Sequence, residues 1–194
     1  MKQNRTIILA SASPRRKQLL EKIGLKFEVD PSDSNEILRL DIPPERMVKA
    51  ISHEKALKVA QKYTDAIIIA ADTLGIFNGK IITKPANRDE AKAMLLELSG
   101  KSHRVITGFT ILDTASKKVT SHTVETKVYF KKLTEEEIDH YINSGEPLDK
   151  AGAYGIQGLG SVLIKKIAGD FYNVIGLPIS ALADSLKKFG VFVL

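Results

Sequence analysis

Runs of apolar residues and alternating polar positions divide the chain into short strands and amphipathic helices. Apolar runs such as Thr6–Ala10 and Asp65–Ala71 are typical of buried strands. The stretches at residues 103–112 and 119–130 are longer and rich in Val, Thr, Ile and Phe. These two stretches predict a pair of antiparallel strands joined through residues 113–118. The strands expected from these patterns span residues 6–10, 26–30, 65–71, 103–112, 119–130 and 161–167.

Helix signals lie between these strands. One helix starts within Ser11–Pro14, with a serine cap and a proline in the first turn, and ends near Ile23. Other helices are expected at residues 43–62, 89–98, 134–143 and 178–189. A hairpin at residues 73–83 has Asn78-Gly79 as its type I′ turn. Helices and strands mix without strict alternation, which predicts an α/β or α+β fold with a twisted mixed sheet flanked by helices.

Composition narrows the class of protein. The 194 residues have the size of one domain or a compact two-lobed one, and there is no cysteine for a disulfide, a thiolate metal site or a thiol nucleophile. No apolar run could cross a bilayer and no signal-peptide pattern is present, so we expect a cytoplasmic protein without a membrane partner. The net charge of +6 fits an anionic partner or simply lysine-rich helix faces, and its even spread argues against a nucleic-acid tail.

The segment Ser11–Arg16 combines several groups that bind anions. It opens a helix, where unpaired N–H groups and the helix dipole favour negative charge. Ser11 and Ser13 add hydroxyls, and Arg15 and Arg16 add planar guanidinium groups that suit phosphate. The segment predicts a phosphate-binding site, although an ordinary capped helix with surface arginines would have the same sequence. It is not a P-loop, because the glycine-rich run and its lysine are missing.

Two carboxylates are candidates for catalysis and metal binding. Asp72 follows an apolar strand, so we expect it at the carboxyl end of that strand, where ligands collect in open α/β sheets. There it could bind a divalent cation or accept a proton from water, or it could simply turn the chain. Glu36, in a polar segment, is the second candidate metal ligand for Mg²⁺ or Mn²⁺, with Asp33 as a weaker third. Taken alone, Glu36 would be a solvated surface residue.

Lysines and one glutamine complete the candidate site. Lys55 lies on an apolar helical stripe with Val48, Ile51 and Val59, so it either extends its charged end to solvent or points into a site. Lys84 precedes a proline after the hairpin, and either ammonium would neutralise charge on a triphosphate. Gln157 lies in the glycine-rich stretch of residues 149–158 and can donate and accept at once, as recognition of a base edge requires. A tight loop between two elements would explain that stretch equally well.

The motifs of the chain resemble those of the Maf family of nucleotide pyrophosphatases, in the same order and over nearly the whole length. The matching segments are residues 9–16, 53–56, 71–73, 83–85, 98–100, 107–108, 146–158 and 172–178, together with His103.

The resemblance implies a single domain, residues 1–194, with two lobes, a central cleft and a fold similar to that of inosine triphosphate pyrophosphatases. It implies metal-dependent hydrolysis of a nucleoside triphosphate between the α and β phosphates, and a homodimer. By position, Asp72 matches the proposed proton acceptor, and Ser11, Arg15, Glu36, Lys55 and Lys84 match polar cleft residues. Arg15, Thr73 and Gln157 match positions linked to base choice.

The sequence of residues 151–158, within the glycine-rich stretch, resembles that of the Maf branch that acts on dTTP and UTP. Hydrolysis of these nucleotides, and of modified pyrimidine triphosphates, is therefore the expected reaction. The 7-methyl-GTP branch of the family is the nearest alternative. A second alternative is a regulatory protein of septum formation or cell division that binds nucleotide or nucleic acid; the dispersed charge and few aromatic residues argue against a nucleic-acid groove. Asn35 and Ala71 depart from residues common in the family.

Overall fold

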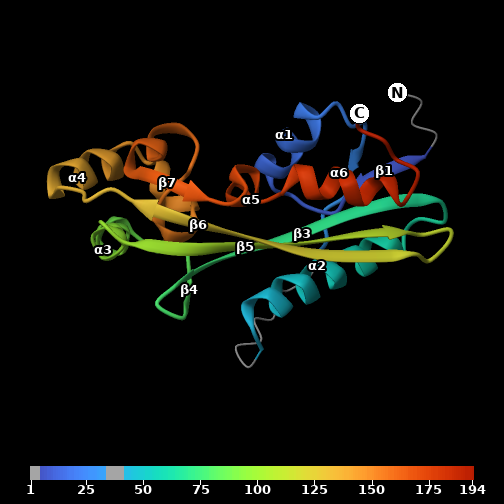
Figure 1. The fold of residues 1–194 in the computed structure, drawn as a ribbon, viewed down its shortest axis with the longest axis horizontal. Coiled ribbons are helices and arrows are strands. Elements are labelled where there is room, and N and C mark those ends of the chain that lie inside the picture. The colour runs from blue at the N-terminus through green and yellow to red at the C-terminus, as the bar shows by residue number, and fades with distance from the viewer. Residues whose placement is uncertain (1–4, 34–41) are drawn as a thin grey trace. The chain divides into compact units, whose positions relative to one another are not determined.

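The computed structural model describes residues 5–33 and 42–194, and Figure 1 shows its ribbon. The strands are β1 (Thr6–Leu9), β2 (Glu28–Val29), β3 (Ala66–Phe77), β4 (Lys80–Ile82), β5 (Ser102–Asp113), β6 (Val119–Phe130) and β7 (Ile164–Ala168). The α-helices are α1 (Pro14–Lys22), α2 (Pro44–Ala60), α3 (Arg88–Leu98), α4 (Glu135–Asn143), α5 (Phe171–Ile175) and α6 (Ile179–Lys187). Three short 3₁₀ helices are η1 (Glu146–Asp149), η2 (Ala151–Ala153) and η3 (Gly158–Leu163).

The described strands form a mixed sheet, which confirms the predicted α/β class. Their order is β2-β1-β3-β5-β6-β7, and β4 pairs with β3 outside this path. The chain divides into two compact units: the first contains residues up to Thr73 with 107–124 and 176–194, and the second contains 74–106 and 125–175. The long strands β3, β5 and β6 therefore contribute residues to both units.

In the first unit, β1 pairs in parallel with β2 and with β3, in a register that runs from Thr6 opposite Ala66 to Leu9 opposite Ile69. Helix α2 covers one face of these strands, and α1 and α6 cover the other (Figure 1). Side chains alternate between the faces of a strand, so Ala66, Ile68 and Ala70 share the face that packs on Ala56 and Val59 of α2.

Helix α2 approaches the sheet unusually closely at Gly108 of β5. A Cβ atom at this position would lie 2.5 Å from the carbonyl carbon and oxygen of Val48, so only glycine fits beneath the helix. A short distance along, the hydroxyls of Ser52 and Thr110 lie 2.9 Å apart and join helix to strand again. The sequence of β5 therefore sets the depth at which α2 packs.

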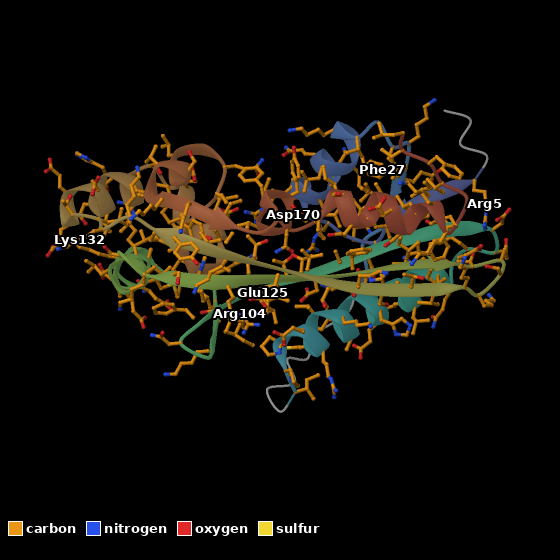
Figure 2. All side chains as sticks on the ribbon, in the orientation of Figure 1. Arg5, Phe27, Arg104, Glu125, Lys132 and Asp170 are labelled. Carbon is orange, nitrogen blue, oxygen red and sulfur yellow. The ribbon has the colours of Figure 1, made fainter. Side chains whose placement is uncertain are left out.

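In the second unit, α3 and α4 pack together over an apolar core that includes Phe77, Leu95, Phe130 and Ile138. Strand β7 pairs antiparallel with β6. Arg104 of β5 and Glu125 of β6 are labelled in Figure 2, and they form a two-pronged ion pair with N···O distances of 2.8 and 2.6 Å.

Most expected elements are confirmed, and three predicted boundaries are wrong. Strand β3 does not end at Ala71 but runs to Phe77, because the arm of the expected hairpin continues it and pairs with β4 from Gly75 onward. The strand expected at residues 26–30 shrinks to Glu28–Val29. The strand expected from Ser161 begins at Ile164, since Ser161 still belongs to η3 and its hydroxyl donates to the carbonyl of Gly158.

In the described part of the chain, no helix is long and apolar enough to span a membrane.

Candidate active site

The segment after β1 forms the start of α1, as predicted. The Ala10 amide donates to the carbonyl of Ile69 at 2.8 Å, which holds the chain at the end of β1. Ser13 caps the helix, since its hydroxyl accepts a hydrogen bond from the Arg16 amide at 3.5 Å. The Ser13 amide in turn donates to the hydroxyl of Ser11 at 3.2 Å, and Ser11 is buried. Both serines therefore shape the turn that presents the helix N-terminus.

Arg16 points into the first unit and fastens three segments together. Its Nε donates to the carbonyl of Gly176 at 3.0 Å, its Nη1 to the hydroxyl of Ser11 at 3.2 Å, and its Nη2 to the hydroxyl of Thr73 at 3.2 Å. The Thr73 hydroxyl also lies 2.9 Å from that of Thr107. The guanidinium donors of Arg16 thus hold α1, β3 and the turn before α6 in register.

Arg15 differs from its neighbour in its surroundings. It is half-buried, and its side chain has no hydrogen-bond or ion-pair partner within residues 5–33 and 42–194. A guanidinium group at the N-terminal turn of a helix, with its fork available, is suited to a phosphate. The predicted phosphate-binding segment thus contains one arginine that organises the protein and one that is available to a ligand.

Asp72 and Lys55 form a buried ion pair. Asp72 continues the face of β3 made by Ala66, Ile68 and Ala70, which lies against α2. Lys55 of α2 extends its ammonium group to Asp72, with 2.8 Å between Nζ and Oδ1, and the two side chains are only 10% and 7% exposed. Lys55 therefore does not extend its charged end to solvent but points to the Asp72 carboxylate. The other carboxylate oxygen, Oδ2, accepts no hydrogen bond from the described residues.

The position of Asp72 along its strand corrects one expectation. Asp72 lies in the interior of β3 and not at its carboxyl end, because β3 continues to Phe77. It does lie three residues beyond Ile69, the last residue of β3 that pairs with β1. Asp72 therefore follows the end of the parallel ladder, although it does not follow the end of the strand.

Asp72 and Thr73 connect the two groups of polar side chains. Adjacent residues of a strand face opposite sides of the sheet. Accordingly, Asp72 contacts α2 through Lys55, and Thr73 contacts the start of α1 through Arg16. One dipeptide of β3 thus joins a buried carboxylate–ammonium pair to a segment that can bind anions.

The remaining candidates are placed less centrally. Lys84 and Gln157 belong to the second unit, where both are exposed and neither side chain has a hydrogen-bond partner among the described residues. Glu36 lies outside the described residues. Asp33 is exposed, and its backbone carbonyl accepts a hydrogen bond from Lys58 at 2.7 Å.

Thr107 and Gly176 have roles that sequence reasoning did not assign. Both contact Thr73, through the Thr107 hydroxyl and the Gly176 carbonyl. Each lies in a segment that matched the family motifs, which was the only signal for them in the sequence. Their distance along the chain from Arg16 and Thr73 explains why no spacing rule could have found these contacts.

The glycine-rich stretch of the second unit contributes Tyr154 to a buried aromatic contact. The Tyr154 hydroxyl lies 2.9 Å from Nε2 of His103, and both residues are buried. Burial lowers the pKa of His103 to about 4 and raises the pKa of Tyr154 well above its ordinary value. Both groups are therefore uncharged at neutral pH, and as buried residues they support the loop from inside the second unit.

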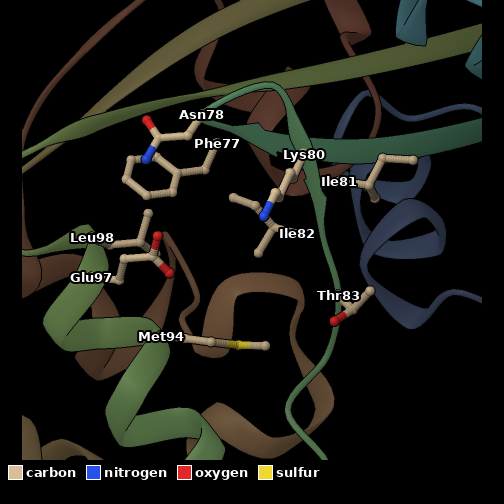
Figure 3. A pocket seen from close by; sticks show the side chains of 9 residues that line it. All are labelled: Phe77, Asn78, Lys80, Ile81, Ile82, Thr83, Met94, Glu97 and Leu98. Carbon is tan, nitrogen blue, oxygen red and sulfur yellow. The ribbon is translucent and has the colours of Figure 1, made fainter. Parts of the chain in front are cut away.

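The second unit also contains a pocket of about 250 Å³, drawn in Figure 3. Phe77, Ile82, Met94 and Leu98 supply most of an apolar lining, and Lys80 and Glu97 bring one charge of each sign. A triphosphate requires several cationic donors, and a carboxylate would repel it. We therefore assign the candidate active site to the region of Asp72 and not to this pocket.

Comparison with known proteins gives the family. A family described as Maf-like protein matches residues 6–189. The chain belongs to the Maf family. It is 48% identical over 188 residues to a protein named dTTP/UTP pyrophosphatase from Desulforamulus reducens, with 96% of this chain and 98% of that one covered. It is 49% identical over 183 residues to a protein of the same name from Alkaliphilus metalliredigens, with 94% and 95% covered.

One solved structure is similar over most of the Maf chain, covering 95% of it and 97% of its own length. That structure is described as a nucleoside-triphosphatase / dITP/XTP pyrophosphatase from Mycobacterium abscessus, with a TM-score of 0.43 and 10% identity. So weak a likeness bears on neither fold nor function. The predicted kinship of fold with inosine triphosphate pyrophosphatases, and the predicted central cleft, stay predictions.

Proposed function

We propose that this Maf chain hydrolyses dTTP and UTP to the monophosphate and pyrophosphate. The observation that carries the proposal is the buried Asp72–Lys55 pair next to the Arg16–Thr73 contact, in a chain 45–49% identical over nearly its full length to proteins named dTTP/UTP pyrophosphatase. In this reaction water attacks the α phosphorus, the bond from that phosphorus to the oxygen bridging to the β phosphate breaks, and pyrophosphate leaves.

Asp72 is the proton acceptor of the proposed reaction. Its Oδ1 is held by the ammonium group of Lys55, which fixes the orientation of the carboxylate. Its Oδ2 accepts no hydrogen bond from the described residues, so this oxygen can take the proton of a water molecule as the bond to phosphorus forms. A carboxylate held by one oxygen and available at the other has the geometry that this step needs.

Phosphate binding falls to the start of α1. Arg15 supplies a guanidinium fork, and the N-terminal turn supplies backbone N–H groups and a partial positive charge. Ser11, Ser13 and Arg16 hold this turn in place, as their hydrogen bonds indicate. Lys84, which is exposed, is the proposed second cation for the triphosphate.

The residues fit a divalent cation of the Mg²⁺ or Mn²⁺ kind. Such ions bind through one or two carboxylates together with phosphate oxygens, and the Asp72 side chain is one such carboxylate. Asp72 and Glu36 would hold it, and the chemistry it supplies is neutralisation of phosphate charge.

Base recognition is assigned to Gln157 and Thr73. The exposed amide of Gln157 can donate and accept at once, matching the mixed donor and acceptor edge of uracil or thymine. The Thr73 hydroxyl is already hydrogen-bonded to Arg16 and Thr107, so it contributes a fixed polar surface.

We also propose that the protein resides in the cytoplasm and forms a homodimer. Cell fractionation tests the first proposal, and size-exclusion chromatography tests the second.

The decisive experiment is a substrate panel with two matched variants. Purified protein is incubated with Mg²⁺ or Mn²⁺ and dTTP, UTP, CTP, GTP or 7-methyl-GTP, and pyrophosphate is quantified apart from free phosphate. Asp72→Asn keeps the size of the side chain and removes its charge, whereas Asp184→Asn makes the same change on the surface of α6. We expect pyrophosphate from dTTP and UTP, retained by Asp184→Asn and lowered at least a hundredfold by Asp72→Asn.

Other outcomes would redirect the proposal. Release of pyrophosphate only from 7-methyl-GTP would keep the reaction and change the base. Free phosphate without pyrophosphate would show that a different bond breaks. Near-normal turnover by Asp72→Asn would remove Asp72 from its role, and no turnover of any nucleotide would favour a regulatory protein.

A further inference from the structure

The carboxylate of Glu146 holds together the loop from Gly155 to Gly160 in the second unit. Its Oε1 accepts hydrogen bonds from the Tyr141 hydroxyl at 3.0 Å and from the Gly160 amide at 3.1 Å. Its Oε2 accepts from the Leu159 amide at 3.0 Å. Three donors on one carboxylate make a strong anchor, because hydrogen bonds to a charged acceptor are about twice as strong as neutral ones.

The other end of the loop is fastened to the same anchor. The Gly155 amide donates to the hydroxyl oxygen of Tyr141 at 3.1 Å, while that hydroxyl donates to Glu146. Burial and the nearby carboxylate raise the pKa of Tyr141 above its ordinary value, so the phenol keeps the proton it donates. Tyr141 and Glu146 thus hold residues 155, 159 and 160, and the segment between these anchors contains Gln157.

The fit around the carboxylate is close. Gly158 has a φ of +68°, and a Cβ atom there would lie 2.7 Å from Oε2 of Glu146. A Cβ atom at Gly160 would lie 2.3 Å from the carbonyl oxygen of Gly155 and 2.7 Å from the Tyr141 hydroxyl. Glycine at these two positions lets the loop fold tightly onto the Glu146 and Tyr141 side chains.

We propose that Glu146 is a positioning residue for base selection: it holds the loop from Gly155 to Gly160 so that Gln157 is presented in one conformation. The inference rests on the proposed function, in which Gln157 contacts the base. Glu146 itself touches no substrate, since its carboxylate is occupied by the three protein donors. The loop loses its order when the carboxylate is lost, and only a fraction of the molecules then present Gln157 correctly.

The expected kinetic signature follows from this role. A binding group that is correctly placed in only a fraction of molecules weakens apparent affinity by that fraction. For Glu146→Gln we expect KM for UTP to rise about tenfold, corresponding to about 1.4 kcal/mol, with kcat changed less than about threefold. The preference for UTP over CTP, as a ratio of kcat/KM, should fall about tenfold, because CTP carries an amino group where UTP carries a carbonyl.

The test compares three variants in the second unit. Glu146→Gln keeps the size but turns one acceptor oxygen into a donor. Tyr141→Phe removes the hydroxyl that joins the two loop ends and keeps the carboxylate. Glu136→Gln makes the same charge change on the exposed face of α4 and serves as the control. Steady-state kinetics with UTP and CTP are measured for each, together with amide hydrogen exchange at Leu159 and Gly160.

Support requires that Glu146→Gln and Tyr141→Phe raise KM, lower the preference for UTP and speed exchange at the two amides, while Glu136→Gln changes none of these. Unchanged selectivity with faster exchange would overturn the role in base selection, and unchanged exchange would overturn the anchor itself. If Glu146→Gln fails to fold, the kinetics and the amide exchange of Tyr141→Phe decide whether the anchor affects base selection. If the unmodified protein released no pyrophosphate from any nucleotide, the proposed function would fall, and the exchange rates alone would decide whether Glu146 holds the loop.

Discussion

The ammonium group of Lys55 lies 2.8 Å from Oδ1 of Asp72 in a place where both side chains are nearly inaccessible to water. A buried ion pair of this kind adds little net stability, because desolvation of the two charges offsets most of their attraction. Its effect is geometric: one oxygen of the carboxylate is fixed, and the other keeps a defined direction. Removing one partner has a larger consequence, since the remaining charge stays buried without compensation.

Replacing Lys55 by Met should therefore destabilise the fold. We expect Lys55→Met to lower the free energy of unfolding by about 3 kcal/mol, because the Asp72 carboxylate stays buried without its ammonium partner. Urea denaturation measures the change. Adding Asp72→Asn to the same chain should recover most of the loss, since no charge is then stranded. If Lys55→Met alone were as stable as the unmodified protein, the ion pair would not be buried in solution.

Gly108 controls the depth at which α2, the helix that contains Lys55, packs on β5. We expect Gly108→Ala to destabilise the protein by about 2–3 kcal/mol, because the added Cβ would meet the Val48 backbone at 2.5 Å. Thermal denaturation checks the stability, and the panel assay should show a parallel loss of pyrophosphate release as Lys55 shifts. Gly75→Ala is the control, since its Cβ would meet only the Ile82 side chain, at 3.3 Å. Equal effects at both glycines would contradict the argument.

The local elements of the fold could be predicted because their signals are local. Thr134 and Glu137 cap α4 as a reciprocal box, and Asn78 and Gly79 take φ values of 50° and 76° in the hairpin turn. The end of β3 could not be predicted in this way. An aspartate after an apolar run is typical of a turn, but in the structure the strand continues past Asp72 and pairs with β4. That pairing involves Ile81 and Ile82, which lie on the other side of the hairpin turn.

The sequence predicts which residues form the candidate site, but it does not predict the contacts between them. The sequence placed Arg15 and Arg16 together as phosphate ligands, and only the structure separates them. Arg16 donates to Gly176, a residue 160 positions away, and no spacing rule reaches so far. The sequence did not predict the pairing of Lys55 with Asp72 either. It indicated Asp72 for catalysis and metal binding and Lys55 for the triphosphate, and their contact depends on how α2 lies over β3.

Arg16 should be intolerant of lysine. Its fork donates in three directions, to Gly176, Ser11 and Thr73, and a single ammonium group on a flexible stem cannot reproduce that planar geometry. We expect Arg16→Lys to cost about 1–2 kcal/mol of stability and to lower pyrophosphate release about tenfold, because Thr73 and the start of α1 lose their register. Arg46→Lys, on the exposed side of α2, is the control. If the two variants behave alike, Arg16 does not join these segments.

His103 should make the protein less stable in mild acid. Burial lowers its pKa from 6.5 to about 4 in the folded chain, so on acidification the unfolded chain takes up the proton first. The stability that the neutral, buried ring contributes is complete above about pH 6.5 and is lost progressively as the pH falls toward about 4, by about 3 kcal/mol in all.

Urea denaturation at about pH 7.5 and about pH 4.5 measures this loss against that of His103→Gln, which has no ring to protonate. Carboxylates and His122 titrate in both proteins, so the difference between the two pH dependences isolates His103. We expect the unmodified protein to lose about 2–3 kcal/mol more than the variant over this interval, even if the variant is less stable at neutral pH. Parallel pH dependences would show that His103 exchanges its proton as readily in the folded chain as in the unfolded one, and that its contact with Tyr154 opens to water.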